Sequence, residues 1–358
     1  MRIALLGVGL IGGSVGLAAR DRAGAVEVRG FDPDHARVEA AAARGAVDRT
    51  AGSVAEALEG ADACFLCAPV TALPALAEEA LAAAAHDCVV TDVGSTKRLI
   101  VAATSDERFV GGHPVAGAET AGVEHARADL FEGAAWYLTP TERSSGLLYE
   151  RLHRLIVALG AHPVAIDAEA HDRLLATVSH VPHVVANVLV AQAARALSEE
   201  AEGLPRVGPS FRDATRVAGA NSRVWSGIYA TNAEAIAAEL DETAEQLTAA
   251  AGLLRDGRAE AIEAWNESAR EDRRRLLEAD LAGGPVRELR VSVPNRPGIV
   301  AQVALALGRG GVNISDMALA PAADMRSGAM TLWVSGDDAA ARAGRLVAEL
   351  GFPVVEAS

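Results

Sequence analysis

Short apolar runs alternate with helical patterns over roughly the first 165 residues of the chain. The predicted strands are Arg2–Leu6, Val26–Phe31, Ala63–Ala68, Cys88–Asp92, Arg108–Gly111 and Ala135–Leu138. Helical stretches lie between most of them. This alternation predicts an α/β domain in which a parallel sheet carries helices on both faces.

Long helices are predicted for the middle of the chain. The stretch Ala170–Ala201 repeats apolar residues at helical spacing, and Pro182 inside it should kink the helix. A loop at Leu204–Pro209 follows, and then two helical stretches near Asn232–Arg255 and Arg258–Leu281. Helices this long and apolar usually bury against each other, often across a dimer interface.

After a predicted linker, Ala282–Pro285, the chain shows a compact β-α-β-β-α-β pattern. The predicted strands are Glu288–Pro294, Val312–Leu319, Ala329–Ser335 and Pro353–Glu356, and the predicted helices are Gly298–Arg309 and Asp338–Leu350. This pattern is typical of a separate ferredoxin-like α+β domain. The predicted domains are therefore 1–166, 167–283 and 287–358.

Composition narrows the classes of partner. The 358 residues suffice for two or three domains, and 50% of them are hydrophobic, which favours packed cores over disorder. The net charge of −15 argues against nucleic acid or an anionic membrane as the main partner, although a local basic pocket can still bind a small anion. No membrane span is predicted. Three cysteines cannot form a disulfide framework, so a cytoplasmic location is expected.

The segment Gly7–Gly12 matches G-x-G-x-x-G between a predicted strand and a predicted helix. Asp32 lies 20 residues after Gly12, as the dinucleotide-binding fingerprint requires. Asp32 would accept hydrogen bonds from ribose hydroxyls and repel a 2′-phosphate, which favours NAD over NADP. The alternative is a glycine-rich turn without a ligand. The predicted cofactor-binding residues are Gly7, Val8, Gly9, Leu10, Ile11, Gly12 and Asp32.

Two candidate catalytic side chains follow predicted strands, at the edge where open α/β sheets bind ligands. Ser95 lies between a strand and a helix and is either a helix N-cap or an active-site hydroxyl. His113 is predicted to lie in a Gly/Pro-rich loop after the strand that ends at Gly111. It is either a surface histidine or a functional one.

The helical region contributes further candidates. His180 and His183 are three residues apart and could share one helix face. No cysteine or carboxylate lies at ligand spacing, so no metal site is predicted, and a substrate contact or a buried histidine is favoured. Arg212 and Arg216 are four apart on a predicted helix, where both could reach one carboxylate. A solvated basic face is the alternative.

Together these segments resemble the prephenate dehydrogenase family, which includes arrogenate (also written arogenate) and cyclohexadienyl dehydrogenases. The matching pieces are Gly7–Gly12 with Asp32, Asp92–Lys97, His113–Gly117, Ser179–His183, and Phe211–Arg216 with Trp225 downstream. The resemblance implies a Rossmann-type NAD-binding domain and an all-α dimerisation domain in a homodimer. The implied reaction is the oxidative decarboxylation of prephenate to 4-hydroxyphenylpyruvate in tyrosine biosynthesis.

The resemblance also implies a role for each candidate residue. His113 would accept the proton of the ring hydroxyl, which suits a neutral imidazole with an ordinary pKa of about 6.5. Ser95 would orient His113 or contact the same hydroxyl. Arg216 would bind a substrate carboxylate, with Arg212, where the family often has lysine, as a second candidate. The other implied substrate-binding residues are His183, His180 and Glu119.

The C-terminal region, through Pro294–Gly298 and Gly311–Ile314, resembles an ACT domain. Such domains commonly bind amino acids and regulate biosynthetic enzymes, so tyrosine or another amino acid is the implied effector. The implied effector-binding residues are Asn295, Arg296, Gly298, Asn313 and Ile314. A structural or dimerising module without a ligand is the alternative.

Several other functions stay open from the sequence. The same chemistry on arogenate would need an acidic residue near the substrate ammonium, for which Asp213 and Glu119 are candidates. A further alternative substrate is 4-amino-4-deoxyprephenate. A β-hydroxyacid dehydrogenase usually relies on a lysine in the helical domain, whereas the only lysine of this chain is Lys97. A non-catalytic sensor of NAD and amino acids is disfavoured by the joint presence of Ser95, His113 and Arg216.

Overall fold

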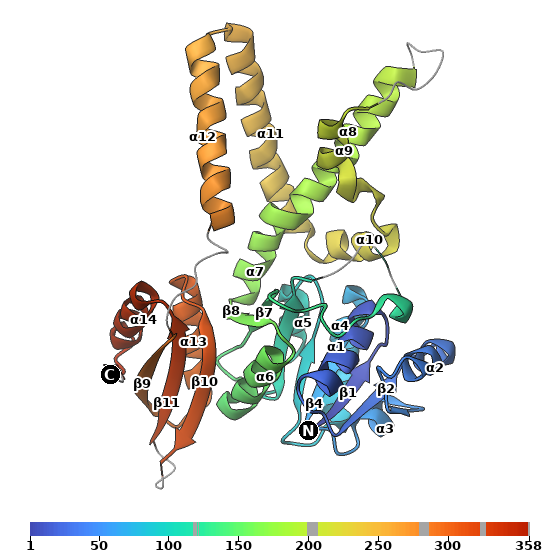
Figure 1. The fold of residues 1–358 in the computed structure, drawn as a ribbon, viewed down its shortest axis with the longest axis vertical. Helices are drawn as coiled ribbons and strands as arrows, with labels where there is room; N and C mark the ends of the chain where they lie inside the picture. Colours follow the sequence, from blue (N-terminus) through green and yellow to red (C-terminus); the bar gives the residue numbers. More distant parts are fainter. Residues whose placement is uncertain (117–119, 121, 199–206, 279–285, 323–326, 357–358) are drawn as a thin grey trace. The chain divides into compact units, whose positions relative to one another are not determined.

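The computed structural model describes residues 1–116, 120, 122–198, 207–278, 286–322 and 327–356 (Figure 1). The chain divides into two compact units, one formed by Met1–Asp172 with Pro285–Ser358 and the other by Arg173–Gly284. The predicted linker at residues 282–285 lies outside the described residues, as do residues 204–206 of the predicted loop.

The N-terminal part of the first unit is built on an eight-stranded sheet with the order β3-β2-β1-β4-β5-β6-β7-β8. The strands are β1 (Arg2–Leu6), β2 (Glu27–Phe31), β3 (Arg49–Thr50), β4 (Ala63–Leu66), β5 (Val89–Asp92), β6 (Phe109–Pro114), β7 (Ala135–Thr139) and β8 (His162–Ala165). The helices are α1 (Leu10–Asp21), α2 (His35–Ala43), α3 (Val54–Leu58), α4 (Leu73–Ala83), α5 (Arg98–Ala103) and α6 (Gly146–Ala158). The predicted Rossmann-type fold is confirmed.

The first strand explains why helices cover both faces of this sheet (Figure 1). Ile3 and Leu5 belong to a hydrophobic cluster with residues of α1 and α6, whereas Ala4 and Leu6 belong to a second cluster with residues of α3, α4 and α5. Successive side chains of a strand point to opposite faces. An uninterrupted apolar strand therefore needs an apolar layer on each side, as parallel sheets have.

The expectation of a fully parallel sheet was wrong. The six strands β3, β2, β1, β4, β5 and β6 are parallel to one another, but β7 runs antiparallel to β6 and β8 is parallel to β7. The described residues between Pro114 and Ala135 contain no α-helix, only the short 3₁₀ turn Val123–His125. Without a crossover helix the next strand returns antiparallel. The sequence did not predict β3, which has two residues, or β8, which contains Pro163.

The C-terminal part of the first unit forms a four-stranded antiparallel sheet with the order β10-β11-β9-β12. Its elements are β9 (Val286–Pro294), α13 (Ile299–Arg309), β10 (Ile314–Pro321), β11 (Ser327–Ser335), α14 (Asp337–Glu349) and β12 (Val354–Glu356). This is the predicted β-α-β-β-α-β fold. Strand β10 packs on α6, where His153 Nε2 lies 3.1 Å from the Ile314 carbonyl oxygen and the Arg154 guanidinium donates to the Met317 carbonyl.

The second unit is entirely helical in its described residues, as predicted. Its chain runs through α7 (Ala168–Leu175), which begins in the first unit, and then α8 (Val181–Ser198), α9 (Pro209–Thr215), α10 (Ser222–Thr231), α11 (Ala233–Asp256) and α12 (Ala259–Glu278). A π-helical turn, Ala176–His180, lies directly before Pro182. Because proline lacks an N–H and clashes with the preceding turn, a wider turn relieves the conflict. The structure therefore has a π-helical turn beside Pro182, where the sequence predicted a kink.

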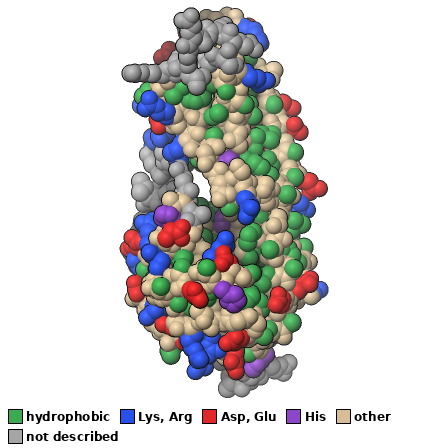
Figure 2. All heavy atoms as spheres, turned by 90° about the vertical axis from the view of Figure 1, so that its right-hand side faces the viewer, with side chains coloured by type: hydrophobic (Ala, Val, Ile, Leu, Met, Phe, Trp, Pro, Cys, Tyr) green, Lys and Arg blue, Asp and Glu red, His purple; other side chains and the backbone are tan. Residues whose placement is uncertain are grey.

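An apolar helix and the distribution of surface charge bear on whether the chain binds a membrane or nucleic acid. The helix Ala168–Ala196 is long and apolar enough to cross a membrane, by length and composition alone, which core helices outside membranes also are. The prediction of no membrane span is therefore not supported by this test. On the face that Figure 2 shows, side chains of both charges are interspersed.

Candidate active site

The turn between β1 and α1 has the geometry that the glycine pattern predicts. Gly7 adopts a φ of +101°, and a Cβ there would lie 2.4 Å from the Cys67 carbonyl oxygen. A Cβ on Gly12 would lie 2.1 Å from the Gly7 carbonyl oxygen. A Cβ on Gly9, the N-cap residue of α1, would meet nothing within 4 Å, and no side chain caps this helix. The start of α1 is thus accessible to an anionic group, which helix N-termini favour.

Asp32 lies directly after β2 and is buried beside this turn. Its Oδ2 accepts a hydrogen bond from the Val8 N–H at 3.2 Å, and its Oδ1 accepts one from the Asp34 N–H at 3.0 Å. The carboxylate therefore links the end of β2 to the glycine turn. Turn, helix start and acidic residue together fit a dinucleotide with an unmodified ribose.

A buried ion pair holds the ends of β5 and β6 together. The Lys97 ammonium pairs with the last residue of β5, Asp92, and both side chains are completely buried. Asp92 also accepts hydrogen bonds from the Gly94 N–H at 2.8 Å and the Gly112 N–H at 3.0 Å. Burial lowers the pKa of Lys97, and the Asp92 carboxylate opposes that shift. The half-buried Ser95 lies in the turn that this pair braces.

The structure corrects two sequence-based expectations at the carboxyl ends of β5 and β6. Strand β6 extends to Pro114, so the buried His113 lies on the strand, opposite Tyr137 of β7, and not in a loop. Ser95 is not the N-cap of α5, because the N-cap residue is Lys97. The N–H groups of Lys97 and Arg98 instead donate to the Asp172 carboxylate at 2.7 and 2.9 Å. The role of Ser95 as an active-site hydroxyl stays a prediction.

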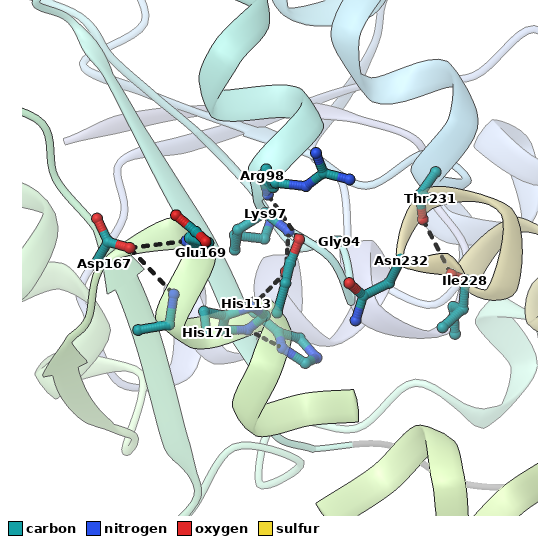
Figure 3. Close-up of polar contacts among 12 residues, drawn as sticks. Gly94, Lys97, Arg98, His113, Asp167, Glu169, His171, Ile228, Thr231 and Asn232 are labelled. Carbon is teal, nitrogen blue, oxygen red and sulfur yellow. Dashed lines mark hydrogen bonds and ion pairs between the residues drawn. The ribbon is translucent and has the colours of Figure 1, made fainter. Parts of the chain in front are cut away.

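His113 is joined to two polar residues at the start of α7 (Figure 3). Its Nδ1 lies 2.9 Å from His171 Nε2, and His171 Nδ1 lies 2.9 Å from Asp172 Oδ1. His171 and Asp172 are both buried. Burial lowers the pKa of His171, which favours its neutral form. Sequence reasoning missed both residues, because their contacts with His113 and with the start of α5 join segments that are far apart in the sequence.

In the second unit, an aromatic cluster surrounds the two candidate histidines. The His183 ring stacks on Trp225 with a centroid distance of 3.6 Å, and its Nδ1 lies 2.5 Å from the Tyr229 hydroxyl. His180 meets the same tryptophan edge-on at 5.9 Å and contacts Asn232. Both histidines therefore share one face, as the spacing predicted. Burial lowers the pKa of His183, so its ring is a neutral hydrogen-bonding group near pH 7.

The arrangement of the two arginines differs from the expectation. Helix α9 ends at Thr215, and Arg216 begins a 3₁₀ turn, Arg216–Gly219, so the two are not one helical turn apart on a continuous α-helix. The Arg212 guanidinium donates to the Val207 carbonyl oxygen at 3.1 Å. Glu119 lies outside the described residues. The role of both arginines as carboxylate ligands stays a prediction.

The implied effector-binding residues lie at the two connections of the first β-α-β step, which the strand register places at opposite ends of the C-terminal sheet. Asn295, Arg296 and Gly298 connect β9 to α13, and Gly298 is the N-cap of that helix with a φ of +80°. Asn313 precedes β10, and Ile314 is its first, buried residue. The structure therefore does not bring the two segments together within one chain, and the effector role of these residues stays a prediction.

This fold and the contents of its sheet edge define a class of protein. An open α/β sheet with a G-x-G-x-x-G turn, an acidic residue after β2 and a buried histidine near the carboxyl end of β6 belongs to a dinucleotide-dependent dehydrogenase.

Comparison with known proteins gives the family within that class. Residues 15–165 match the model of the prephenate dehydrogenase nucleotide-binding domain, and residues 167–267 match that of the prephenate dehydrogenase dimerization domain. The chain is 30% identical over 350 residues to the prephenate dehydrogenase of Bacillus subtilis (strain 168), covering 95% of this chain and 94% of that protein. The chain therefore belongs to the prephenate dehydrogenase family.

Two solved structures are similar to this fold. Prephenate dehydrogenase from A. aeolicus, in complex with hydroxyphenyl propionate and NAD+, has a TM-score of 0.73 at 27% identity and covers 77% of this chain and 98% of its own. The arogenate dehydrogenase of Synechocystis has a TM-score of 0.67 at 26% identity and covers 77% and 100%. The names of these two proteins thus contain two of the three substrates considered from the sequence, prephenate and arogenate.

Proposed function

We propose that this chain is an NAD-dependent prephenate dehydrogenase that forms 4-hydroxyphenylpyruvate for tyrosine biosynthesis. The observation that carries the proposal is the placement of the glycine turn, Asp32 and His113 at the carboxyl edge of one sheet. NAD supplies a hydride acceptor when it is bound. The first turn of α1 would hold its pyrophosphate, and Asp32 would bind its ribose hydroxyls.

His113 is the proposed general base. Its imidazole would accept the proton of the ring hydroxyl while hydride leaves the carbon that bears this hydroxyl. The ring carboxylate then departs as carbon dioxide. The electron pair of the broken carbon–carbon bond completes the aromatic ring and leaves a phenolate oxygen, which takes the proton back from His113 to form the hydroxyl group of the product. A positioned general base contributes about 10²- to 10⁴-fold to such a step. The Ser95 hydroxyl, on the turn beside the Asp92–Lys97 pair, is proposed to contact the same substrate oxygen.

The substrate-binding residues are proposed to come from the helical unit. Arg216 would bind a carboxylate of prephenate through a bidentate contact. The aromatic cluster that holds His183 and His180 offers neutral hydrogen-bonding groups for the remainder of the substrate. Arg212 and Glu119 stay secondary candidates. The match to a dimerization domain supports a homodimer. The cytoplasmic location is proposed from the three cysteines, which cannot form a disulfide framework.

The C-terminal module is proposed to be an ACT domain that binds tyrosine or another amino acid. Its β-α-β-β-α-β topology supports this. The proposed effector contacts are Asn295, Arg296 and Gly298, whereas Asn313 and Ile314 lie at the opposite end of the sheet and would not reach the same ligand within one chain. Because the match to the B. subtilis enzyme covers 95% of this chain, the similarity extends into this module. Effector control would require two states of the enzyme with different affinity for the amino acid.

The test is NADH formation, followed at 340 nm with purified chain, NAD and prephenate, arogenate or 4-amino-4-deoxyprephenate. Turnover of prephenate is expected, with suppression by tyrosine if the C-terminal module is regulatory. Turnover of arogenate alone would transfer the same mechanism to the amino-acid substrate. No turnover of any of the three, with NAD binding intact, would refute the proposed function.

A further inference from the structure

Three buried side chains form one hydrogen-bonded row in the first unit. His113 Nδ1 lies 2.9 Å from His171 Nε2, and His171 Nδ1 lies 2.9 Å from Asp172 Oδ1. The two imidazole rings meet edge to face, with centroids 5.1 Å apart and planes at 73°. His171 is 0% exposed and Asp172 is 2% exposed, so bulk water does not compete for these contacts.

The contacts of Asp172, at one end of this row, determine which nitrogen atom of His171 carries the hydrogen. Asp172 Oδ1 accepts from the Lys97 N–H and Oδ2 accepts from the Arg98 N–H, at 2.7 and 2.9 Å. Both oxygens therefore act as acceptors, and the contact with His171 requires that His171 Nδ1 carries the hydrogen. The opposite tautomer would turn a nitrogen lone pair towards a carboxylate oxygen at 2.9 Å.

The tautomer of His113 follows from the charge of His171. Burial lowers its pKa, and the nearby Lys97 ammonium acts in the same direction, so the ring is neutral near pH 7. A neutral imidazole that donates from Nδ1 can only accept at Nε2. His113 must then donate from its own Nδ1. Its Nε2 carries the lone pair, which is the form a general base requires.

We propose that His171 and Asp172 are positioning residues that hold His113 in the Nδ1–H tautomer and so present its Nε2 as the proton acceptor. The inference rests on the proposed role of His113 as the base. When His113 has taken the hydroxyl proton, its Nδ1–H still donates to His171 Nε2, and the polarised His171 donates to the Asp172 carboxylate. The row thereby stabilises the imidazolium without a second proton transfer, as the orienting aspartate of a serine-protease triad does.

The central variant is His171→Leu, which removes the acceptor for His113 Nδ1. We expect kcat to fall roughly 10²-fold, less than the ~10⁴-fold that loss of the orienting aspartate costs a serine protease. The KM for prephenate and the Kd for NAD should stay within about two-fold, because neither site is altered. His171→Gln, which can place an amide oxygen near His113, should recover most of kcat. His153→Leu, the same substitution at a buried histidine outside the row, should leave kcat unchanged at pH 8.

A double variant separates this inference from the proposed function. If His171 acts only through His113, His113→Asn with His171→Leu will be no slower than His113→Asn alone. Additive losses would overturn the positioning role. If His113→Asn is slow but His171→Leu is as fast as the wild type, the inference fails and the proposed base stands. If His113→Asn retains its kcat, the proposed base itself is wrong.

A second measurement does not depend on the folding of a variant. Imidazole ¹⁵N chemical shifts of the wild-type chain, with the His113 signals assigned by their loss in His113→Asn, distinguish the two neutral tautomers. The expected result is a protonated Nδ1 and an unprotonated Nε2 at pH 8. A protonated Nε2 in His113 would overturn the inference whatever the kinetics of His171→Leu.

Discussion

The buried pair formed by Lys97 and Asp92 yields a stability prediction whose size follows from the contacts. Lys97→Met removes the ammonium but keeps the length of the side chain, and it leaves Asp92 with hydrogen bonds from the Gly94 and Gly112 N–H groups. Breaking a buried ion pair by deleting one partner costs about 3–5 kcal/mol. Because two N–H donors still stabilise the carboxylate, we expect a loss of about 3 kcal/mol, at the lower end of that range.

Removal of the carboxylate of this pair, instead of the ammonium, should lower the stability more. Asp92→Leu leaves the Lys97 ammonium buried without its carboxylate and leaves two backbone N–H groups without their acceptor. Each unsatisfied buried donor costs about 1–3 kcal/mol. Loss of the ammonium proton limits the penalty, since burial already lowers the pKa of Lys97. We therefore expect a loss of about 5 kcal/mol or more, and the order of the two variants is the sharper prediction.

The assay should report on this sheet edge alone, because a chain with several modules does not unfold in one two-state step. Hydrogen exchange with mass spectrometry on peptides spanning β5 and β6 gives the local opening free energy. The control is Arg37→Met, which removes an exposed ion pair to Asp34 and should change stability by less than about 0.5 kcal/mol. The reasoning is refuted if Lys97→Met matches the wild type, or if it costs more than Asp92→Leu.

Four further predictions follow from the site. His113→Asn should lower kcat about 10²- to 10⁴-fold in the NADH assay, and an unchanged kcat would remove His113 from the mechanism. Arg216→Ala should mainly raise the KM for prephenate, and an unaltered KM would place the carboxylate contact elsewhere. Gly12→Ala should abolish NAD binding in a titration followed by fluorescence, because its Cβ would lie 2.1 Å from the Gly7 carbonyl oxygen. Burial lowers the pKa of His153 to about 4, against 6.5 in the unfolded chain, so the unfolded chain binds the proton first as the pH falls. The free energy of unfolding should therefore decrease by about 3 kcal/mol between about pH 6.5 and pH 4. His153→Leu should remove that decrease in urea titrations.

Sequence alone predicted the turns and strands that are determined by residues close to one another in the chain. The Gly7–Gly12 turn, its strand and its helix are contiguous, and a φ of +101° at Gly7 is a local requirement for glycine. The strands of the C-terminal module could be placed within two residues or so because their apolar positions alternate and glycines separate them. Local chemistry of this kind is readable without knowledge of tertiary contacts.

The errors came from contacts between distant residues. Ser95 was a plausible helix cap, but Asp172, 77 residues later in the sequence, supplies the capping carboxylate instead. His113 was expected in a loop because of its glycine neighbours, yet pairing with β7 extends the strand through it. The role of His171 depends on a contact across 58 residues, which no local pattern indicates.

Three acidic residues lie at the carboxyl edge of the sheet or cap an element there, although the proposed substrate and cofactor are both anionic. Each carboxylate is nevertheless fully engaged: Asp32 by two backbone N–H groups, Asp92 by two backbone N–H groups and Lys97, and Asp172 by two backbone N–H groups and His171. All six oxygens thus accept at least one hydrogen bond, so donor dipoles and one ammonium offset their negative charge. The same bonds fix the backbone of the glycine turn, the β5–α5 turn and the start of α5. An edge built in this way can hold His113 in a defined orientation beside an anionic ligand, because protein donors offset the charge of its carboxylates. Each Asp32 oxygen accepts one of these hydrogen bonds and keeps a second lone pair for a ribose hydroxyl.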